Sequence, residues 1–143
     1  MKLSKFNLAD NNIAVEKDGQ QLDLKNCFFF VGMNHDVINQ ELSLRWIKGF
    51  GETVTNELPD ELLFEFSGVS FFKAQQRDVS QAYPRDEFLK QMGFMNNSSI
   101  DEIGDDYSHQ PSDDRDHLCL EFNSGAAIKF SADEATLMTK VNI

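Results

Sequence analysis

A two-residue alternation of apolar and polar side chains constrains the fold of this chain more than any other feature. It recurs over residues 42–46, 62–66 and 118–122, where Leu, Phe or Trp occupies most of the alternate positions. Successive side chains of a β-strand point to opposite faces, so each segment predicts a strand with one face in the core. The thirteen Phe residues, against two Tyr and one Trp, favour a packed apolar interior.

Turn residues join these strands into hairpins. Asp18-Gly19 lies between segments 13–17 and 20–24, and both residues accept the positive φ of a type I′ turn. Asn123-Ser124-Gly125 separates 117–122 from 126–130 in the same way. The apolar run at 27–31 ends before Gly32 and predicts a strand buried on both faces. After Ser67-Gly68, residues 69–73 predict a further strand.

Two segments predict helices. Pro84 lies shortly before segment 86–92, which begins with two acids and ends before Gly93. Acids in the first turn and a terminal glycine are typical of a short helix. Ser131 and Glu134 have capping-box spacing, which predicts a second helix through residue 138. A last edge strand is the alternative for this second segment.

These patterns predict an α+β fold, with a mainly antiparallel β-sheet that forms a sandwich or a partly closed barrel and one or two short helices. A chain of 143 residues has the length of one domain, and no linker divides it, so a single domain over 1–143 is expected. Cys27 and Cys119 are the only cysteines. We expect two buried thiols, with a disulfide as the alternative if their strands are neighbours.

The excess of acidic over basic residues argues against some classes of ligand. Twenty-four acidic residues against thirteen basic ones give a net charge of −11. Nucleic acids and anionic membranes both require a basic surface, which argues against either as a direct ligand. The chain shows no apolar secretory signal and no stretch near the ~20 apolar residues of a membrane span, so a cytoplasmic location is expected.

One long connection concentrates the acidic charge. The segment at about 96–116 carries seven acids and one base, which is −6 of the total charge of −11. A connection of this length is unusual in a compact domain and is often functional. We expect this acidic loop to steer a basic protein partner, because complementary charge accelerates association.

Catalytic patterns are weak. His109, Asp113, Asp114, Asp116 and His117 offer nitrogen and oxygen ligands for a metal, but their spacing fits no standard zinc or calcium site. His35-Asp36 offers a general base without a recognisable nucleophile motif. We therefore expect no enzyme activity, no metal and no cofactor.

Three segments together resemble a known family. These are Leu42-Ser43-Leu44-Arg45-Trp46, the stretch from Leu63 through Phe66-Ser67-Gly68-Val69 to Phe72, and Leu118-Cys119-Leu120-Glu121-Phe122-Asn123-Ser124-Gly125. In order and character they resemble the small acidic immunity proteins of bacterial polymorphic-toxin and contact-dependent inhibition systems. The resemblance implies a cytoplasmic protein without catalysis that binds a protein partner, and it assigns no functional residue.

The expected function is non-catalytic binding and neutralisation of a basic protein, most simply by an immunity protein against its cognate toxin. The alternatives are a stand-alone structural or adaptor domain, or a small metal-dependent hydrolase. Tyr107 is the large aromatic residue of the acidic loop, and interface hot spots favour Tyr. The predicted partner-binding residues are Asp101, Glu102, Asp105, Asp106, Tyr107, Asp113, Asp114 and Asp116.

Overall fold

The computed structural model describes residues 1–78, 80, 87–98, 103 and 107–142. These residues form twelve β-strands in three sheets, and no helix occurs among them. The β-sheet character is therefore confirmed, whereas the prediction of an α+β fold is wrong: the described chain is all-β. The sheets pack around one shared apolar core, so the helices that were expected at the side of the sheet are not needed to close it.

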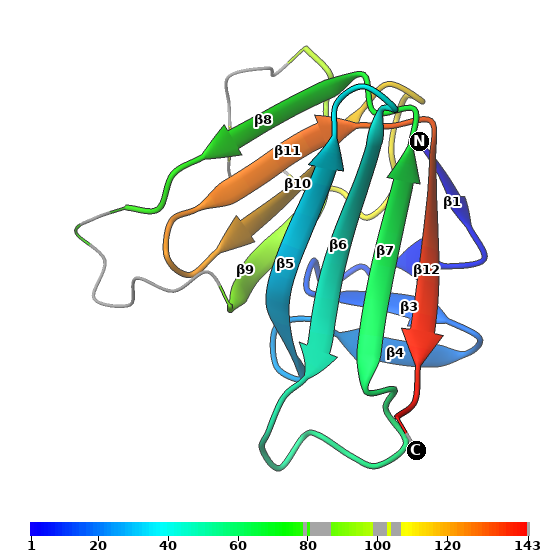
Figure 1. Cartoon of the computed structure of the whole chain (residues 1–143), viewed down its shortest axis with the longest axis vertical. Helices are drawn as coiled ribbons and strands as arrows, with labels where there is room; N and C mark the ends of the chain where they lie inside the picture. The colour runs from blue at the N-terminus through cyan, green and yellow to red at the C-terminus, as the bar shows by residue number, and fades with distance from the viewer. Residues whose placement is uncertain (79, 81–86, 99–102, 104–106, 143) are drawn as a thin grey trace.

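The largest sheet has five strands in the order β1-β12-β7-β6-β5. In Figure 1 it faces the viewer with its strands near vertical. All neighbours in it are antiparallel except β1 and β12, which are parallel. Its strands are β1 (Lys2–Ser4), β5 (Phe28–Asp36), β6 (Glu41–Lys48), β7 (Glu61–Ser67) and β12 (Glu134–Lys140).

The second sheet has four antiparallel strands in the order β8-β11-β10-β9. It lies behind the first sheet, and its strands cross those of the first obliquely (Figure 1). Its strands are β8 (Phe71–Gln75), β9 (Leu89–Met95), β10 (His117–Phe122) and β11 (Ala127–Ser131). Two sheets stacked in this way form a sandwich, with the inward side chains of both in the core.

A small antiparallel sheet, in the order β2-β3-β4, lies behind the lower part of the five-stranded sheet in Figure 1 and adds Leu8, Val15 and Leu22 to the core. It consists of β2 (Asn7–Leu8), β3 (Ala14–Lys17) and β4 (Gln20–Asp23). Asp18 and Gly19 form the β3–β4 turn with φ angles of 52° and 77°, between the paired residues Lys17 and Gln20. The predicted type of hairpin is confirmed at this position.

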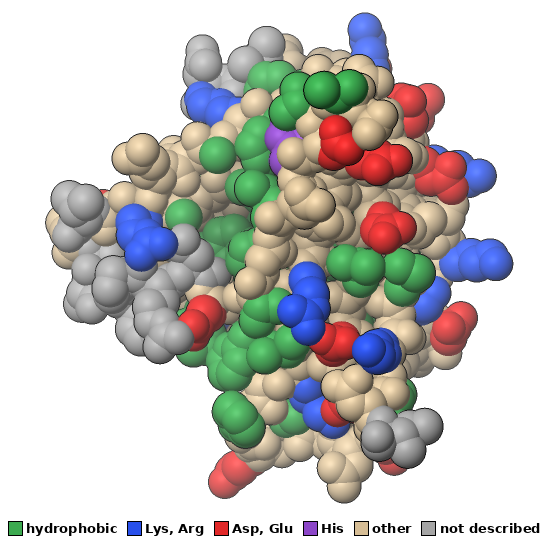
Figure 2. All heavy atoms as spheres, in the orientation of Figure 1, with side chains coloured by type: hydrophobic (Ala, Val, Ile, Leu, Met, Phe, Trp, Pro, Cys, Tyr) green, Lys and Arg blue, Asp and Glu red, His purple; other side chains and the backbone are tan. Residues whose placement is uncertain are grey.

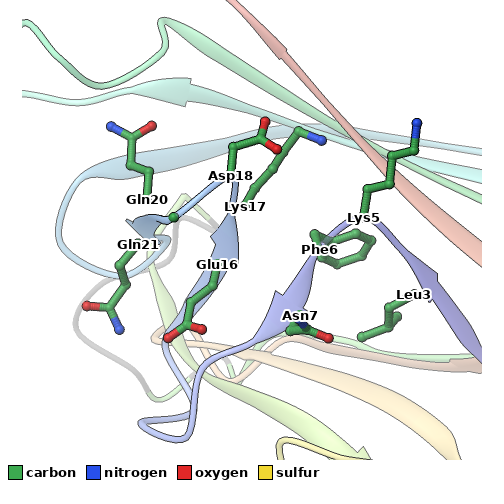
Figure 3. A pocket seen from close by; sticks show the side chains of 10 residues that line it. Leu3, Lys5, Phe6, Asn7, Glu16, Lys17, Asp18, Gln20 and Gln21 are labelled. Atoms are coloured by element: carbon green, nitrogen blue, oxygen red, sulfur yellow. The ribbon is translucent and has the colours of Figure 1, made fainter.

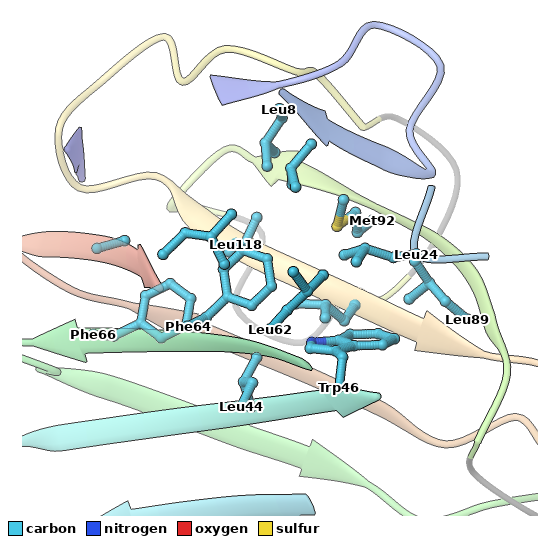
Figure 4. Close-up of a cluster of buried hydrophobic side chains, with 14 of the residues drawn as sticks. Leu8, Leu24, Leu44, Trp46, Leu62, Phe64, Phe66, Leu89, Met92 and Leu118 are labelled. Carbon is cyan, nitrogen blue, oxygen red and sulfur yellow. The ribbon is translucent and has the colours of Figure 1, made fainter. Parts of the chain in front are cut away.

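The core lies where the two large sheets face each other, as Figure 4 shows. Trp46 of β6 and Phe130 of β11 are both fully buried. Aromatic contacts cross between the sheets: the rings of Phe66 and Phe130 lie 4.6 Å apart, edge to face, and those of Phe30 and Phe122 lie 5.0 Å apart. The alternation over 42–46, 62–66 and 118–122 therefore marks core strands, as predicted.

Both predicted helices are wrong. Leu89 to Met95 form β9, and a register shift between Glu121 and Phe122 leaves Lys90 unpaired on the β9 side. This bulge moves Met92 onto the face of Leu89, and the resulting spacing of three residues resembles a helical one. At the C-terminal end, Ala135 and Leu137 are buried and alternate with more exposed residues, so the segment forms β12, inside the sheet rather than at its edge.

The expectations for the first long strand and for the cysteines have different outcomes. β5 continues through Gly32 to Asp36, and Val31 is 42% exposed, so the predicted end and the burial on both faces are wrong. Val31 is the extra residue of a bulge between Phe30 and Gly32, which turns it away from the core. Cys27 and Cys119 are both free and buried, as predicted.

Candidate functional site

An acidic groove crosses the outer face of the five-stranded sheet near one end of its strands. It has a volume of about 500 Å³. Strand pairing builds two rows across the sheet, one joining Asp36, Glu41, Ser67 and Glu134, the other joining Asn34, Ser43, Glu65 and Thr136. Figure 2 shows Asp and Glu side chains gathered over this part of the sheet. No lysine or arginine lines the groove among the residues described.

Two of the four carboxylates are held in place by neighbours. The backbone N–H of Asn39 donates to Asp36, and so does its side-chain amide, at 3.1 and 2.8 Å. These hydrogen bonds hold the pKa of Asp36 below its ordinary value. The hydroxyl of Ser4 donates to Glu134 at 2.6 Å. Both side chains are therefore preorganised as hydrogen-bond acceptors.

The other two carboxylates, those of Glu41 and Glu65, are exposed. Within the described residues neither of them accepts a hydrogen bond or forms an ion pair. Like charges opposite each other on neighbouring strands are destabilising, and Asp36 is paired directly with Glu41. A cationic group placed in the groove would relieve this repulsion.

An apolar hairpin tip borders the groove. Val37 and Ile38, in the turn between β5 and β6, are 71% and 92% exposed. The tip is tied down on both sides, by Asn39 donating to Asp36 and by the N–H of Val69 donating to the carbonyl of Gln40 at 2.9 Å. The molecule therefore presents two large aliphatic side chains on a fixed turn beside four carboxylates.

The other half of the same face is electrically mixed. Glu61 pairs with both Arg45 and Lys140. The hydrogen bond from Arg45 is the main cause that holds the pKa of Glu61 below its ordinary value. Leu63 and Met138 lie between these charges in a shallow apolar hollow. Positive and negative groups neutralise each other here, so the net negative field of this face arises at the groove.

A second large hollow, of about 530 Å³, lies between the β1–β2 corner and the β3–β4 hairpin (Figure 3). Its charged side chains are Lys5, Lys17, Glu16 and Asp18, two of each sign. A balanced lining of this kind selects no sign of ligand charge. The acidic groove is therefore the stronger candidate for recognition.

The predicted acidic loop is only partly described. Asp101, Glu102, Asp105 and Asp106 lie outside the described residues. Asp113 is exposed and accepts hydrogen bonds from the backbone and the side chain of Arg115 at 2.8 and 3.4 Å, which lower its pKa. Asp114 is exposed, and its carbonyl accepts a hydrogen bond from the N-terminal ammonium of Met1 at 2.6 Å.

Asp116 is placed differently from the other acids of the loop. It is 2% exposed, and its carboxylate accepts hydrogen bonds from the backbone of Ser112, Asp113 and Asn97 and from the hydroxyl of Ser112. Burial acts to raise the pKa of Asp116, but these donors together hold it below the ordinary value. Its carboxylate therefore ties Asn97 to Ser112 and Asp113, near the two ends of the loop.

Tyr107 packs against the outer face of the four-stranded sheet. A Cβ on Gly93 would come within 2.6 Å of the Cβ of Tyr107, so the ring base lies directly over this glycine. The hydroxyl of Tyr107 donates to Glu121 at 2.7 Å and lies 3.3 Å from the Sγ of Cys119. Gln91 donates to the other oxygen of Glu121 at 2.9 Å. Burial is the main cause that raises the pKa of Tyr107.

The cluster continues along this face with buried polar groups. His117 is 5% exposed, its ring stacks on Phe71 at 4.4 Å, and Lys129 is fully buried. Burial raises the pKa of Cys119 to about 11, so its thiol is neutral and unreactive at physiological pH. No group of three His, Cys, Asp or Glu side chains in the described chain is arranged to hold a metal ion.

Sequence reasoning missed the groove. Its acids occupy outward positions of β5, β6, β7 and β12, and the alternation at 42–46 and 62–66 does place Glu41 and Glu65 on the solvent side. What the sequence does not contain is the register that brings Glu134, from the segment predicted as a helix, into the same row. Without strand order, these acids are scattered along almost a hundred residues.

No helix in the described part of the chain is long and apolar enough to cross a membrane. Comparisons with models of protein families, with curated proteins and with solved structures gave no match.

Proposed function

We propose that this protein is a non-catalytic, cytoplasmic binding protein that neutralises a basic protein partner, as an immunity protein neutralises its cognate toxin. The observation that carries this proposal is the acidic groove with the apolar hairpin tip beside it. Four carboxylates without a lysine or arginine among them, next to exposed Val37 and Ile38, combine a charged rim with an apolar anchor. Stable protein interfaces likewise combine an apolar core with a polar rim.

Electrostatics supports a basic partner. The chain carries a net charge of −11, and the groove concentrates negative potential on one face. Complementary charge raises association rates from about 10⁵–10⁶ M⁻¹s⁻¹ toward 10⁸ M⁻¹s⁻¹ at low salt. Glu41 and Glu65 are free to pair with incoming lysine or arginine, because no neighbour in the described chain engages them.

The acidic loop contributes to the same end of the molecule. The N-terminal ammonium of Met1 donates to the carbonyl of Asp114, and the next residue, Lys2, is the backbone register partner of Glu134 in the parallel β1–β12 pair. The exposed carboxylates of Asp113 and Asp114 therefore lie near the groove. We propose that they extend its steering field, while Tyr107 and Asp116 hold the loop against the sheet.

The proposal is tested by capturing the partner and measuring its association. The full chain is used to capture proteins from an extract of the cell that makes it, the bound protein is identified by mass, and it is then purified. Expressed alone, that protein should arrest growth, and co-expression of this chain should restore it. The association rate should fall at least about tenfold between low and physiological salt.

A matched pair of variants locates the contact. Glu41→Gln with Glu65→Gln should slow association at low salt by about fivefold or more. Glu52→Gln with Glu57→Gln removes the same charge from exposed acids outside the groove, and should change the rate less than twofold by the same reasoning. If the two pairs of variants slowed association equally, the groove would act only through the overall negative charge of the protein. A captured protein that is acidic, or that does not arrest growth, would refute the proposal.

A further inference from the structure

β5 is an edge strand of the five-stranded sheet, and most of its outer edge has no strand partner among the described residues. Near its start, the N–H of Phe30 donates to the carbonyl of Glu87 at 3.0 Å. From residue 31 to 36, the only strand that pairs with it in the described structure is β6. The unpaired N–H and C=O groups of a strand edge are a template for another extended segment.

This edge lacks most of the usual protection. β5 has nine residues and contains no lysine or proline, with a bulge at Val31 as its one irregularity. The opposite edge of the sheet, β1, has three residues and carries Lys2, and the edge strand β8 has five and carries Lys73. At the edge strand β9, Phe94 pairs with Ser108. Natural proteins shorten, charge or cover edges to prevent pairing, so β5 stands out.

Apolar side chains follow the same edge. Val31 and Met33 are each 42% exposed, and the edge ends at the exposed tip formed by Val37 and Ile38. Figure 2 shows a band of hydrophobic side chains beside β5, from this tip at the top toward the loop after β6. Phe50 of that loop is 89% exposed, and its ring lies 6.2 Å from that of Phe29. Exposed apolar bands of this kind mark interaction sites.

Charge decides what occupies the edge. Asp36 ends β5 and begins the first row of the groove, so a strand added to β5 extends both rows by one position. Side chains on the outer face of the added strand then lie about 5 Å from the outer residues of β5. A second copy of this chain would place another charge of −11 beside the groove. A cationic segment meets complementary charge instead.

We propose that the β5 edge binds an extended segment of the basic partner, in which lysine or arginine alternates with apolar residues. The apolar side chains lie on the Met33 side of the added strand, and the cationic side chains lie on the side of the acidic groove. This mode rests on the proposed function, because it takes the charge of the partner from it. The backbone supplies affinity, and the alternation of side chains supplies specificity.

The test uses an acetylated and amidated peptide, Lys-Val-Lys-Val-Lys-Val-Lys, with the full-length protein. Amide hydrogen exchange is measured by NMR with and without the peptide. Exchange within residues 31–36 should slow by about tenfold or more for the amides that face away from β6. A control peptide with proline in place of the central valine should give no protection, because proline cannot donate to the ladder.

Variants separate this proposal from the proposed function. Met33→Lys should weaken peptide binding by about fivefold or more, because lysine protects edges. Met138→Lys makes the same change at a side chain that is 48% exposed on β12, and should have less than a twofold effect, since β12 lies inside the sheet. Thermal unfolding of both variants shows that they are folded.

Several outcomes overturn the edge proposal: no binding of the peptide, equal binding of the proline peptide, or equal binding by Met33→Lys. If binding depends on Glu41 and Glu65 while exchange in β5 does not change, the edge proposal fails and the proposed function stands. If the captured partner associates independently of salt and of the groove, the proposed function fails, whatever the peptide does. If sedimentation instead reveals a dimer of this chain that Met33→Lys dissociates, the occupant of the β5 edge is a second copy of the chain, and the proposal of a basic partner segment fails.

Discussion

The outer faces of the two large sheets carry similar alternating polar residues but have opposite environments. On the five-stranded sheet, Glu41, Arg45 and Glu65 are exposed, and the face is open to a partner. On the four-stranded sheet, His117 and Lys129 are buried. Aromatic rings cover this second face: Tyr107, from the long connection, lies over Gly93 and bonds Glu121, and Phe71 stacks on His117. Polar residues at alternate positions therefore predict a strand, but they do not predict whether its polar face is exposed to solvent.

The two faces consequently have different energetic roles. A polar group buried between layers costs free energy unless it is hydrogen-bonded, so the partners of Glu121 and Asp116 stabilise the fold. Exposed pairs such as Arg45–Glu61 contribute little, because water and salt screen them. We therefore expect substitutions on the covered face to change stability, and substitutions on the open face to change binding.

The largest effect is expected at Gly93 in the four-stranded sheet, with Gly32 in the five-stranded sheet as its control. Gly93→Val should destabilise the protein by about 2–3 kcal/mol, since its Cβ would overlap Tyr107. Gly32→Val is the matched control on β5, because a Cβ there has nothing within 4 Å, and it should change stability by less than about 0.5 kcal/mol. Urea unfolding of both variants measures the difference, and equal destabilisation would show that Tyr107 does not cover the second sheet.

The fold could be predicted from the sequence wherever the spacing of apolar residues within a segment is regular. The core strands at 42–46, 62–66 and 118–122 and the Asp18-Gly19 hairpin were predictable because a regular alternation or a turn residue marks them. β9 was not, because the bulge at Lys90 changes a spacing of two into a spacing of three, which is also typical of a helix. The capping-box spacing of Ser131 and Glu134 likewise led to the wrong prediction of a helix. Ser131 is instead part of β11, where it pairs with Phe71.

The site was harder to predict than the fold for a related reason. The composition of the loop shows that it is rich in acids. It does not predict that the side chains of Asp116 and Tyr107 turn inward. Across the sheet, the groove depends on a register among four strands, and a one-residue slip would move every carboxylate to the other face. Local patterns predict strands, whereas the neighbours of each strand decide where charge accumulates.

A smaller effect is expected when one hydroxyl is removed from the covered face. Tyr107→Phe keeps the ring over Gly93 but leaves Glu121 with Gln91 as its remaining hydrogen-bond donor among the described side chains. The protein should lose about 1.5 kcal/mol of stability, which is typical of a hydrogen bond to a charged group. Arg45→Met, which removes an exposed partner of Glu61, should shift the unfolding midpoint less. The reverse order would contradict the contrast between the faces.

A pH profile distinguishes the faces further. Burial, with a contribution from Lys129, holds the pKa of His117 below its ordinary value of 6.5. As the pH falls, His117 is therefore protonated more readily in the unfolded chain than in the folded protein. Its contribution to the free energy of unfolding is fully present above pH 6.5 and declines as the pH falls below 6.5. His117→Phe keeps the stacking on Phe71 and should flatten the unfolding free energy between pH 7 and 5. An unchanged slope in this window would exclude His117 as its source.

The smallest effect is expected where the acidic loop and the acidic groove are compared as steering surfaces. Asp113→Asn with Asp114→Asn removes two exposed charges near the groove, and Asp113 is already partly offset by its hydrogen bonds from Arg115. Association with the captured partner at low salt should slow by only about twofold, against fivefold or more for Glu41→Gln with Glu65→Gln. Both differences should vanish at high salt, because screening removes steering from any exposed charge. If the loop variant proved the slower of the two, the loop would be the principal contact and the groove would only add to its field.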